Sequence, residues 1–258
     1  MKDSILIKTT GIRKTLARRE VLKGVDIEIN RGETRVIIGR SGCGKSVFLK
    51  LLIGLFSPDS GQVYIDGKET TVLSATKQRQ MMHKFGMLFQ GAALFDSLTI
   101  RDNIAFKHIR DGEKSGKEID MLVAEKLELV GLSGIEDRKP AELSGGMQKR
   151  VGLARAIADD PEIILYDEPT TGLDPITADQ INDLIIHLQE VLNVTSIAVT
   201  HDMVSAKKIG TNISMLYNGT IIETVKASKI DRSRNPVVQQ FINGEARGPI
   251  TDTQGALR

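Results

Sequence analysis

The sequence predicts an α/β fold, in which a largely parallel sheet is covered by helices on both faces. The apolar strand Val36–Ile38 runs through a glycine-rich turn into a predicted helix at Lys45–Leu55. A second apolar run at Ile163–Tyr166 leads to a predicted helix at Pro175–Leu192 and then to another strand. Between these two strand–helix units, residues 99–160 show helical periodicity, which indicates a helical subdomain inserted into the sheet domain.

The remaining strand signals add an antiparallel part to this sheet. Alternating, β-branched segments predict strands at Ile5–Lys8 and Val25–Ile29, and Asp66-Gly67 supplies a turn after a strand at Gln62–Ile65. Beyond these, we predict strands at Phe85–Phe89, Ser196–Val199 and Ile213–Tyr217, helices at Ile100–Ile109, Glu118–Val130 and Gly146–Ala158, and a turn at Asn218-Gly219. Two brief helices and a polar tail from Gly244 complete the expected order.

Length and composition fit an ordinary globular protein. A chain of 258 residues with 40% apolar content can form one large domain or two closely joined ones. We predict a core made of residues 1–98 and 161–243, a helical subdomain of residues 99–160 and a C-terminal tail of residues 244–258. The 35 basic and 33 acidic residues are interspersed, so the composition indicates no nucleic-acid partner.

The cysteine content and the apolar runs predict the compartment. Cys43 is the only cysteine, which excludes an intrachain disulfide and fits a reducing compartment. The most apolar stretch, Val47–Phe56, is interrupted by Lys50 and Gly54, and no run approaches the length of a membrane-spanning helix. The N-terminus lacks the apolar part of a secretory signal, so we expect the protein in the cytosol.

Residues 39–46 read Gly-Arg-Ser-Gly-Cys-Gly-Lys-Ser and fit the P-loop pattern, in the strand–loop–helix setting that this pattern requires. The glycines let successive backbone N–H groups point into one concavity, where they and the positive end of the helix hold the β- and γ-phosphates. Lys45 adds a point charge, and the Ser46 hydroxyl can ligate Mg²⁺. The predicted nucleotide contacts are Gly39, Arg40, Ser41, Gly42, Cys43, Gly44, Lys45 and Ser46.

Two carboxylates, Asp167 and Glu168, come directly after the strand Ile163–Tyr166. Open parallel sheets bind their ligands at the C-terminal ends of strands. Beside a P-loop, Asp167 is suited to hold Mg²⁺ directly or through a water. Glu168 is suited to take a proton from the water that attacks the γ-phosphate.

Further polar residues stand where predicted elements begin or end. Ser144-Gly145-Gly146 opens a helix, as a serine cap followed by flexible glycines would, and this turn has no lysine of its own. Gln90 and His201 each follow a strand, and Asp174 precedes a helix. Taken alone, His201 would more often be structural than catalytic.

The motifs in this chain are Gly39 to Ser46, Gln90, Leu143-Ser144-Gly145-Gly146, Tyr166-Asp167-Glu168, Asp174 and His201. In this order and spacing they resemble the ABC-transporter nucleotide-binding domain along nearly the whole chain. The resemblance implies a P-loop NTPase fold of the ABC ATPase type, with a RecA-like mixed sheet core, an antiparallel β subdomain and an inserted helical subdomain. It also implies hydrolysis of ATP with Mg²⁺, and two copies that clamp two ATP molecules head to tail.

The same resemblance assigns roles to single residues. Gln90 resembles the lid residue that senses the γ-phosphate and touches the membrane partner, and His201 resembles the switch residue that contacts the γ-phosphate. Ser144, Gly145 and Gly146 match the signature that binds the nucleotide of the other copy. The adenine-stacking position, usually aromatic, falls on Leu16, where apolar contact with help from Arg18 would replace stacking. The implied catalytic residues are Glu168, His201, Gln90 and Lys45, the implied metal ligands are Ser46, Gln90 and Asp167, and Asp174 joins the nucleotide contacts.

Three segments carry a narrower resemblance: residues 85–99, the run Asp174-Pro175-Ile176-Thr177, and residues 238–249. They are similar to the ATPase subunit of the Mla-type phospholipid transporter. This likeness implies a membrane permease, an MCE lipid-binding protein and a small STAS-like regulatory subunit as partners, and phospholipid movement between inner and outer membranes. It also implies a peripheral position on the cytoplasmic face of the bacterial inner membrane. An ATPase for polar amino acids, metals or drugs is the alternative.

Two other classes of protein are weighed against the transport motor. Soluble ABC proteins of DNA or ribosomes usually fuse two motor domains or carry coiled coils or zinc-binding inserts, which this sequence lacks. A P-loop kinase or small GTPase would have neither the turn at Leu143 to Gly146 nor the carboxylate pair after Tyr166.

Overall fold

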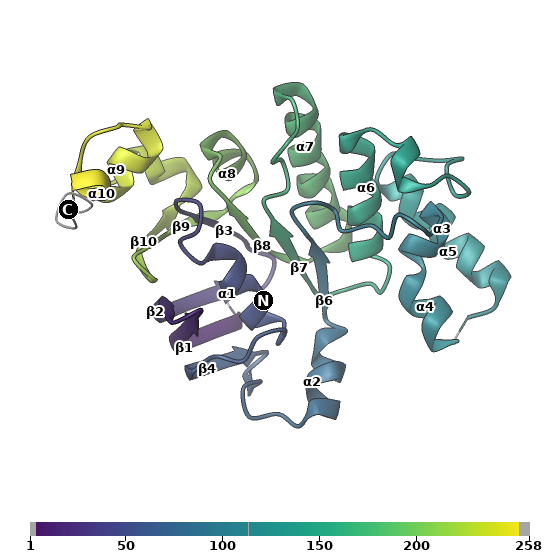
Figure 1. Ribbon diagram of the computed structural model, residues 1–258, viewed down its shortest axis with the longest axis horizontal. Coiled ribbons are helices and arrows are strands. Elements are labelled where there is room, and N and C mark those ends of the chain that lie inside the picture. The colour runs from purple at the N-terminus through teal and green to yellow at the C-terminus, as the bar shows by residue number, and fades with distance from the viewer. Residues whose placement is uncertain (1–3, 113, 253–258) are drawn as a thin grey trace. The chain divides into compact units, whose positions relative to one another are not determined.

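The computed structural model describes residues 4–112 and 114–252 (Figure 1). Its internal contacts divide the chain into two units. Unit 1 combines Met1–Val72 with Val199–Arg258, and unit 2 is Leu73–Ala198. Both units contain strands covered by helices, so the predicted α/β class is confirmed. In the part of the chain that the structure describes, no helix has the length and apolar character needed to cross a bilayer.

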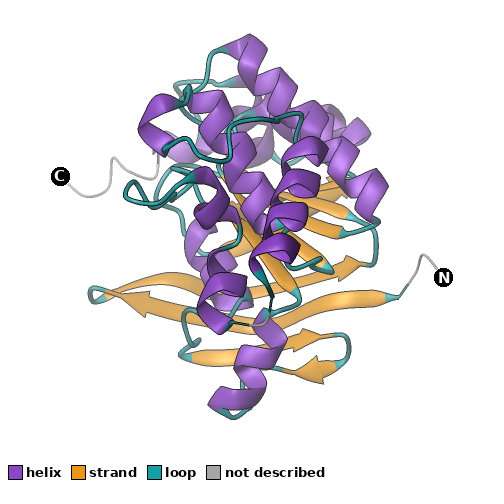
Figure 2. Cartoon of the chain, turned by 90° about the vertical axis from the view of Figure 1, so that its right-hand side faces the viewer, coloured by secondary structure: helices purple, strands orange, loops and turns teal. Residues whose placement is uncertain are grey.

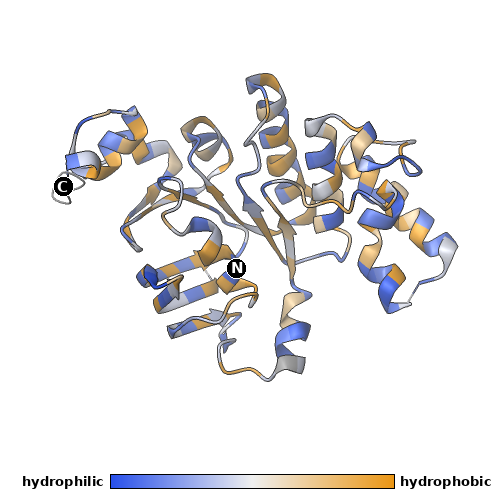
Figure 3. Cartoon of the chain, viewed as in Figure 1, coloured by the Kyte–Doolittle hydropathy of each residue, from blue (hydrophilic) through white to orange (hydrophobic). Residues whose placement is uncertain are grey.

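Unit 1 contains an antiparallel sheet with the strand order β2-β1-β4-β5. Its strands are β1 (Ile5–Leu16), β2 (Arg19–Asn30), β4 (Ser60–Ile65) and β5 (Lys68–Glu69). β1 and β2 form a long hairpin (Figure 2), and Figure 3 shows polar and apolar bands along both strands. Such alternation is typical of a sheet with one buried face. The predicted strands Ile5–Lys8 and Val25–Ile29 were therefore correct in type but too short.

The second group of strands in unit 1 carries the predicted P-loop. β3 (Thr34–Ile38) pairs in parallel with β9 (Asn212–Tyr217), which pairs antiparallel with β10 (Thr220–Lys226). All five residues of β3 are buried. β10 was not predicted, because its residues are mostly half-buried and give only a weak alternating signal.

The helices of unit 1 flank these strands. They are α1 (Lys45–Leu52), α8 (Met203–Ile209), α9 (Pro236–Asn243), α10 (Pro249–Asp252) and the 3₁₀ segment Ala227–Arg232. The 3₁₀ segment and α9 are the two predicted brief helices. Part of the expected polar tail is folded, because the side chain of Ile250 is buried and its amide donates to Gln240 Oε1 at 2.7 Å. The rest of that tail, residues 253–258, lies outside the described residues.

Unit 2 has the strand order β8-β7-β6. These strands are β6 (Phe85–Leu88), β7 (Ile163–Asp167) and β8 (Thr195–Thr200), and β6 pairs in parallel with β7. Every residue of β7 and β8 is buried, as continuous apolar runs predict. Its helices are α2 (Ala75–Met82), α3 (Ile100–Ile104), α4 (Phe106–Asp111), α5 (Gly116–Leu129), α6 (Gly145–Ala156), α7 (Pro175–Leu192) and the 3₁₀ turn Pro140–Glu142.

Two helix predictions in unit 2 needed correction. The single helix predicted at Ile100–Ile109 is split into α3 and α4 at Ala105, whose backbone leaves the helical region at φ −88° and ψ 10°. α2 was missed, because its sequence is mostly polar and presents no apolar stripe of helical period.

Candidate functional site

The predicted P-loop connects β3 to α1, as its pattern requires. Two of its glycines are needed because other atoms approach closely. A Cβ on Gly39 would lie 2.5 Å from the carbonyl oxygen of Leu216, and one on Gly44 would lie 2.8 Å from Val21 Cγ1. Gly44 also caps α1 with φ 109°, in the region that favours glycine. The loop is thus packed against β2 and β9 by its backbone.

Lys45 is the first residue of α1 and is only 5% exposed. Its Nζ donates to the carbonyl of Gly39 at 2.8 Å and to the carbonyl of Arg40 at 3.2 Å. The ammonium group therefore lies across the loop, at the positive end of the α1 dipole. This combination of a fixed cation, loop N–H groups and a helix N-terminus favours binding of phosphate.

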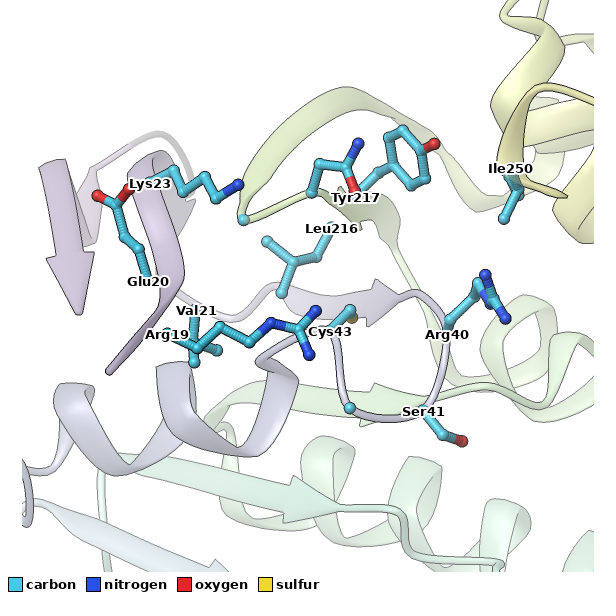
Figure 4. Close-up of a pocket in the computed structure, with 13 residues that line it drawn as sticks. Arg19, Glu20, Val21, Lys23, Arg40, Ser41, Cys43, Leu216, Tyr217 and Ile250 are labelled. Carbon is cyan, nitrogen blue, oxygen red and sulfur yellow. The ribbon is translucent and has the colours of Figure 1, made fainter. Parts of the chain in front are cut away.

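A pocket of about 530 Å³ opens beside this loop (Figure 4). Its basic side chains are Arg19, Lys23 and Arg40, and its acidic one is Glu20. The wall is formed by Arg19, Glu20, Val21, Lys23, Arg40, Ser41, Gly42, Cys43, Leu216, Tyr217, Asn218, Gly219 and Ile250. An excess of positive charge next to the P-loop suits an anionic ligand.

The predicted base-contact residue Leu16 is half-buried and does not line this pocket. It pairs across the hairpin with Arg19, which does. Between them, Ala17 and Arg18 both have positive φ, 47° and 66°, as a tight hairpin turn requires. Adenine contact by Leu16 stays a prediction.

Three of the predicted polar residues of unit 2 lie at one edge of its strands. Because Leu88 of β6 is in register with Tyr166 of β7, both strands end at the same edge. Gln90 lies two residues beyond β6, while Asp167 and Glu168 lie at the end of β7. The structure thus brings Gln90 and the two carboxylates to the same edge of these strands.

Both carboxylates are buried, Asp167 at 5% and Glu168 at 7% exposed. Glu168 has φ 49°, a left-handed conformation that is uncommon for a residue other than glycine. The Thr171 hydroxyl donates to Glu168 Oε2 at 3.2 Å, and the Thr171 amide donates to the Glu168 carbonyl at 3.3 Å. The local turn therefore fixes both the backbone and the carboxylate of Glu168.

Sequence reasoning missed a buried cation at this edge. Lys149 of α6 donates from Nζ to the carbonyl of Gln90 and, at 3.4 Å, to the carbonyl of Glu168. Burial lowers the pKa of Lys149, and the charges of Asp167 and Glu168 oppose that shift. The only sequence signal for this position is that Lys149 lies four residues after Gly145, on the same face of a helix. A surface lysine would have the same spacing.

The glycine turn before α6 lies against the start of α7. The Ser144 hydroxyl accepts a hydrogen bond from the Met147 amide at 3.3 Å, so it is the expected helix cap. A Cβ on Gly146 would lie 2.6 Å from Thr177 Cγ2, which explains glycine there. Asp174 caps α7 by accepting from the amides of Ile176 and Thr177 at 3.0 Å each.

Hydrogen bonds from Thr177 lower the pKa of Asp174, so its carboxylate stays ionised at neutral pH. Ser144, Gly145 and Asp174 are exposed. The structure therefore brings the glycine turn and Asp174 together on an accessible surface of unit 2.

The two units divide the predicted site residues between them. Unit 1 carries Leu16, Gly39, Arg40, Ser41, Gly42, Cys43, Gly44, Lys45, Ser46 and His201. Unit 2 carries Gln90, Ser144, Gly145, Gly146, Asp167, Glu168 and Asp174. His201 is exposed and follows β8, just before Asp202, the cap of α8. One nucleotide site built from both groups stays a prediction.

The donor atoms of the predicted metal ligands determine which ion they could hold. No group of three or more His, Cys, Asp or Glu residues that could hold a metal ion is found among residues 4–112 and 114–252. Ser46 and Asp167 supply hard oxygen donors, which fit Mg²⁺ when phosphate oxygens and waters complete its shell.

Comparisons with known proteins agree with the ATP-binding motifs found in the sequence. The family model described as ABC transporter matches residues 22–171. A probable ribonucleotide transport ATP-binding protein, Mkl of Mycobacterium leprae, is 41% identical over 97% of this chain and 72% of its own length. The intermembrane phospholipid transport system ATP-binding protein MlaF of Haemophilus influenzae is 36% identical over 95% of this chain and 93% of its own length.

Other relatives carry other cargo names. The methionine import ATP-binding protein MetN of Geobacillus kaustophilus is 40% identical over 84% of this chain and 64% of its own length.

Among solved structures, a dimeric ATP-binding cassette in a post-hydrolysis state with ADP and Pi aligns with a TM-score of 0.78 and 34% identity. That alignment covers 86% of this chain and 99% of the solved chain.

Proposed function

Since this chain belongs to the ABC transporter family and is one of its ATPases, we propose that it drives the movement of phospholipid between membranes. The assignment of phospholipid as the cargo rests on the likeness to the phospholipid ATPase of Haemophilus influenzae, which extends over nearly the full length of both chains. Generic ATP-binding motifs occupy only part of that length. The resemblance in residues 85–99, the segment proposed to face a permease, supports the same cargo.

In this proposal, binding and cleavage of ATP are assigned to different residues. The P-loop and Lys45 bind the phosphates, and Glu168 accepts a proton from the attacking water. Ser46, Asp167 and Gln90 would hold Mg²⁺, which neutralises charge on the β- and γ-phosphates. His201 would contact the γ-phosphate.

A second copy of the chain completes each ATP site in this proposal. Ser144 and Gly145 are exposed at the start of α6 and are thus accessible to another subunit. A helix start with an exposed serine and glycine is suited to bind phosphate, although it lacks a lysine. The solved relative is itself described as a dimer. Two motor subunits would serve two permease subunits on the cytoplasmic face of an inner membrane, with an MCE lipid-binding protein and a STAS-like subunit as further partners.

Import of a small solute is the second candidate, because the methionine import protein has 40% identity to this chain. The two candidate functions predict different defects in a strain from which the gene for this chain is deleted. Deletion in a Gram-negative host should weaken the outer-membrane lipid barrier, measured by sensitivity to detergent, and leave amino-acid uptake normal. A deletion strain that keeps its barrier but loses uptake of one solute would support the importer instead.

The lone cysteine offers a direct test of where the nucleotide binds. Cys43 is a half-buried free cysteine that lines the pocket beside the P-loop, two residues before the start of α1. A bulky maleimide on Cys43 should block ATP binding, and bound Mg·ATP should slow the labelling. Labelling rates by mass spectrometry, with and without Mg·ATP, measure this. Fast labelling with full ATP binding would place Cys43 away from the phosphates.

The segment Gly91–Phe95 is the proposed contact with the permease. Phe95 is 45% exposed, and its ring lies 4.6 Å from that of Phe106, centroid to centroid. Asn103 fixes the segment, because its side chain accepts from the Phe95 amide at 2.7 Å and donates to the Phe95 carbonyl at 3.1 Å. An ordered, partly apolar surface of this kind is suited to receive a short helix from a partner.

Leu94→Asp should therefore leave the subunit folded and able to bind ATP, yet detach it from the permease. Leu94 is half-buried, so a charge there changes the contact surface without occupying the core. Co-purification of the permease from membranes measures the effect, and Val191→Asp on α7, where the valine is 53% exposed, is the matched control. Normal complex assembly by Leu94→Asp would exclude this segment as the contact.

A further inference from the structure

One face of α6 holds the backbone of both polar loops at the edge of β6 and β7. The positions on this face are Gly145, Lys149, Gly152 and Arg155, spaced as one stripe of a helix. A Cβ on Gly152 would lie 2.7 Å from Leu88 Cδ1 and 3.2 Å from Ala92 Cβ, so the helix packs directly against the end of β6. Within unit 2, α6 thus connects the exposed turn at Ser144 to the loop after Gln90.

Lys149 makes the connection to the carboxylate edge. Its side chain is 5% exposed, and its ammonium donates to two carbonyls on separate loops, those of Gln90 and Glu168. A buried ammonium needs such acceptors, because burial without them costs far more than a normal hydrogen bond returns. The two loops are therefore held at one separation by one cation.

The backbone held in this way is in an unfavourable conformation at Glu168, where φ is 49°. A left-handed residue other than glycine persists only where its surroundings over-determine it. The Glu168 carbonyl accepts from the Thr171 amide and from Lys149 Nζ. Lys149 is the one of these that also reaches the Gln90 loop.

Arg155 acts on the next residues in the same manner. Its guanidinium donates to the carbonyls of Ala92 at 2.6 Å and Ala93 at 2.7 Å. Both alanines are left-handed, with φ 58° and 49°. α6 therefore stabilises two unfavourable backbone segments by two long cations, and this repetition argues against an incidental contact.

We propose that Lys149 is a positioning residue for ATP hydrolysis, which holds the backbone of Glu168 against that of Gln90. The inference rests on the proposed role of Glu168 as the base. Lys149 does not touch the reacting atoms. It fixes the direction of the Glu168 carboxylate relative to the Gln90 loop, and it lies one turn along α6 from the glycines that would meet the second copy.

Lys149→Met tests this role in the full-length chain, because methionine fills similar space without donating. We expect kcat for ATP hydrolysis to fall about 10- to 100-fold, as misplacing a catalytic group does, with ATP affinity within about threefold of the parental value. Lys149→Arg keeps the donors and should recover most of kcat. If the methionine variant does not fold, Lys149→Gln, with a shorter neutral donor, should give a kcat below that of Lys149→Arg.

Lys126→Met is the matched control. Lys126 is also a buried lysine of unit 2, but it pairs with Asp160 at 2.7 Å and Glu125 at 2.8 Å, away from the loops held by α6. The Lys126→Met substitution should lower the melting temperature without changing kcat per folded molecule. A folded Lys149→Met variant with parental kcat, or equal losses in the Met and Arg variants, overturns the positioning role alone. A parental chain without ATPase activity overturns the proposed function and this inference with it.

Discussion

Glu168→Gln should lower the rate of ATP hydrolysis by about 10²-fold or more while ATP binding survives. Glutamine has the shape of glutamate and an oxygen that can still accept from the Thr171 hydroxyl, so the turn is kept. It cannot take a proton from water. Binding of ATP would then proceed to the two-subunit clamp, which accumulates because its release requires hydrolysis.

The measurements are kcat, equilibrium binding of Mg·ATP and the fraction of dimer by size-exclusion chromatography. Glu162→Gln is the control, since Glu162 lies near the start of β7, pairs with Lys84 at the surface and should leave kcat unchanged. A Glu168→Gln variant that turns over ATP at the parental rate would remove the base assignment. Loss of ATP binding in that variant would show instead that Glu168 holds the fold of the site.

Lys45→Ala should abolish turnover and weaken ATP binding. A charge-assisted contact contributes roughly 1.5–3 kcal/mol, so affinity should fall about 10- to 150-fold. The structure adds a second reason, because the same ammonium donates to the carbonyls of Gly39 and Arg40. Its removal also loosens the loop whose N–H groups bind the phosphates.

Lys50→Ala provides the comparison for Lys45→Ala on the same helix. Lys50 lies over the ring of Phe56, 5.7 Å from its centroid, and it makes no part of the P-loop. We expect parental ATP affinity and hydrolysis from this control, measured by titration calorimetry and phosphate release. Hydrolysis that survives Lys45→Ala would be incompatible with the P-loop assignment.

The parts of the site that the sequence predicted are those with a fixed local geometry. A glycine-rich turn between β3 and α1 has few backbone solutions, so Gly39–Ser46 could be placed without knowing any distant contact. The continuous apolar run before Asp167 required a buried strand, and parallel strands then bring Gln90 to the same edge. The apolar pattern of a strand can be read from its own segment of the sequence, without knowledge of distant contacts.

The parts that the sequence did not predict depend on pairs of distant segments. Lys149 and Arg155 have the same side chains as any exposed basic residue of a helix, and only packing of α6 against β6 shows that Lys149 is buried and Arg155 half-buried. Likewise, Arg19, Gly219 and Ile250 meet at one pocket from three separate parts of unit 1. The break at Ala105 follows no glycine or proline, the usual signals for a helix end.

The left-handed backbone at Glu168 has an evolutionary consequence. Holding a non-glycine residue there costs the folded state about 1–3 kcal/mol, which glycine at the same position would avoid. Selection for stability alone would therefore favour glycine at position 168, whereas the proposed role of Glu168 as the base predicts that selection for hydrolysis retains the glutamate. A lineage in which this subunit had become a passive partner of an active copy should lose the acid early, at the point where stability and turnover compete most directly.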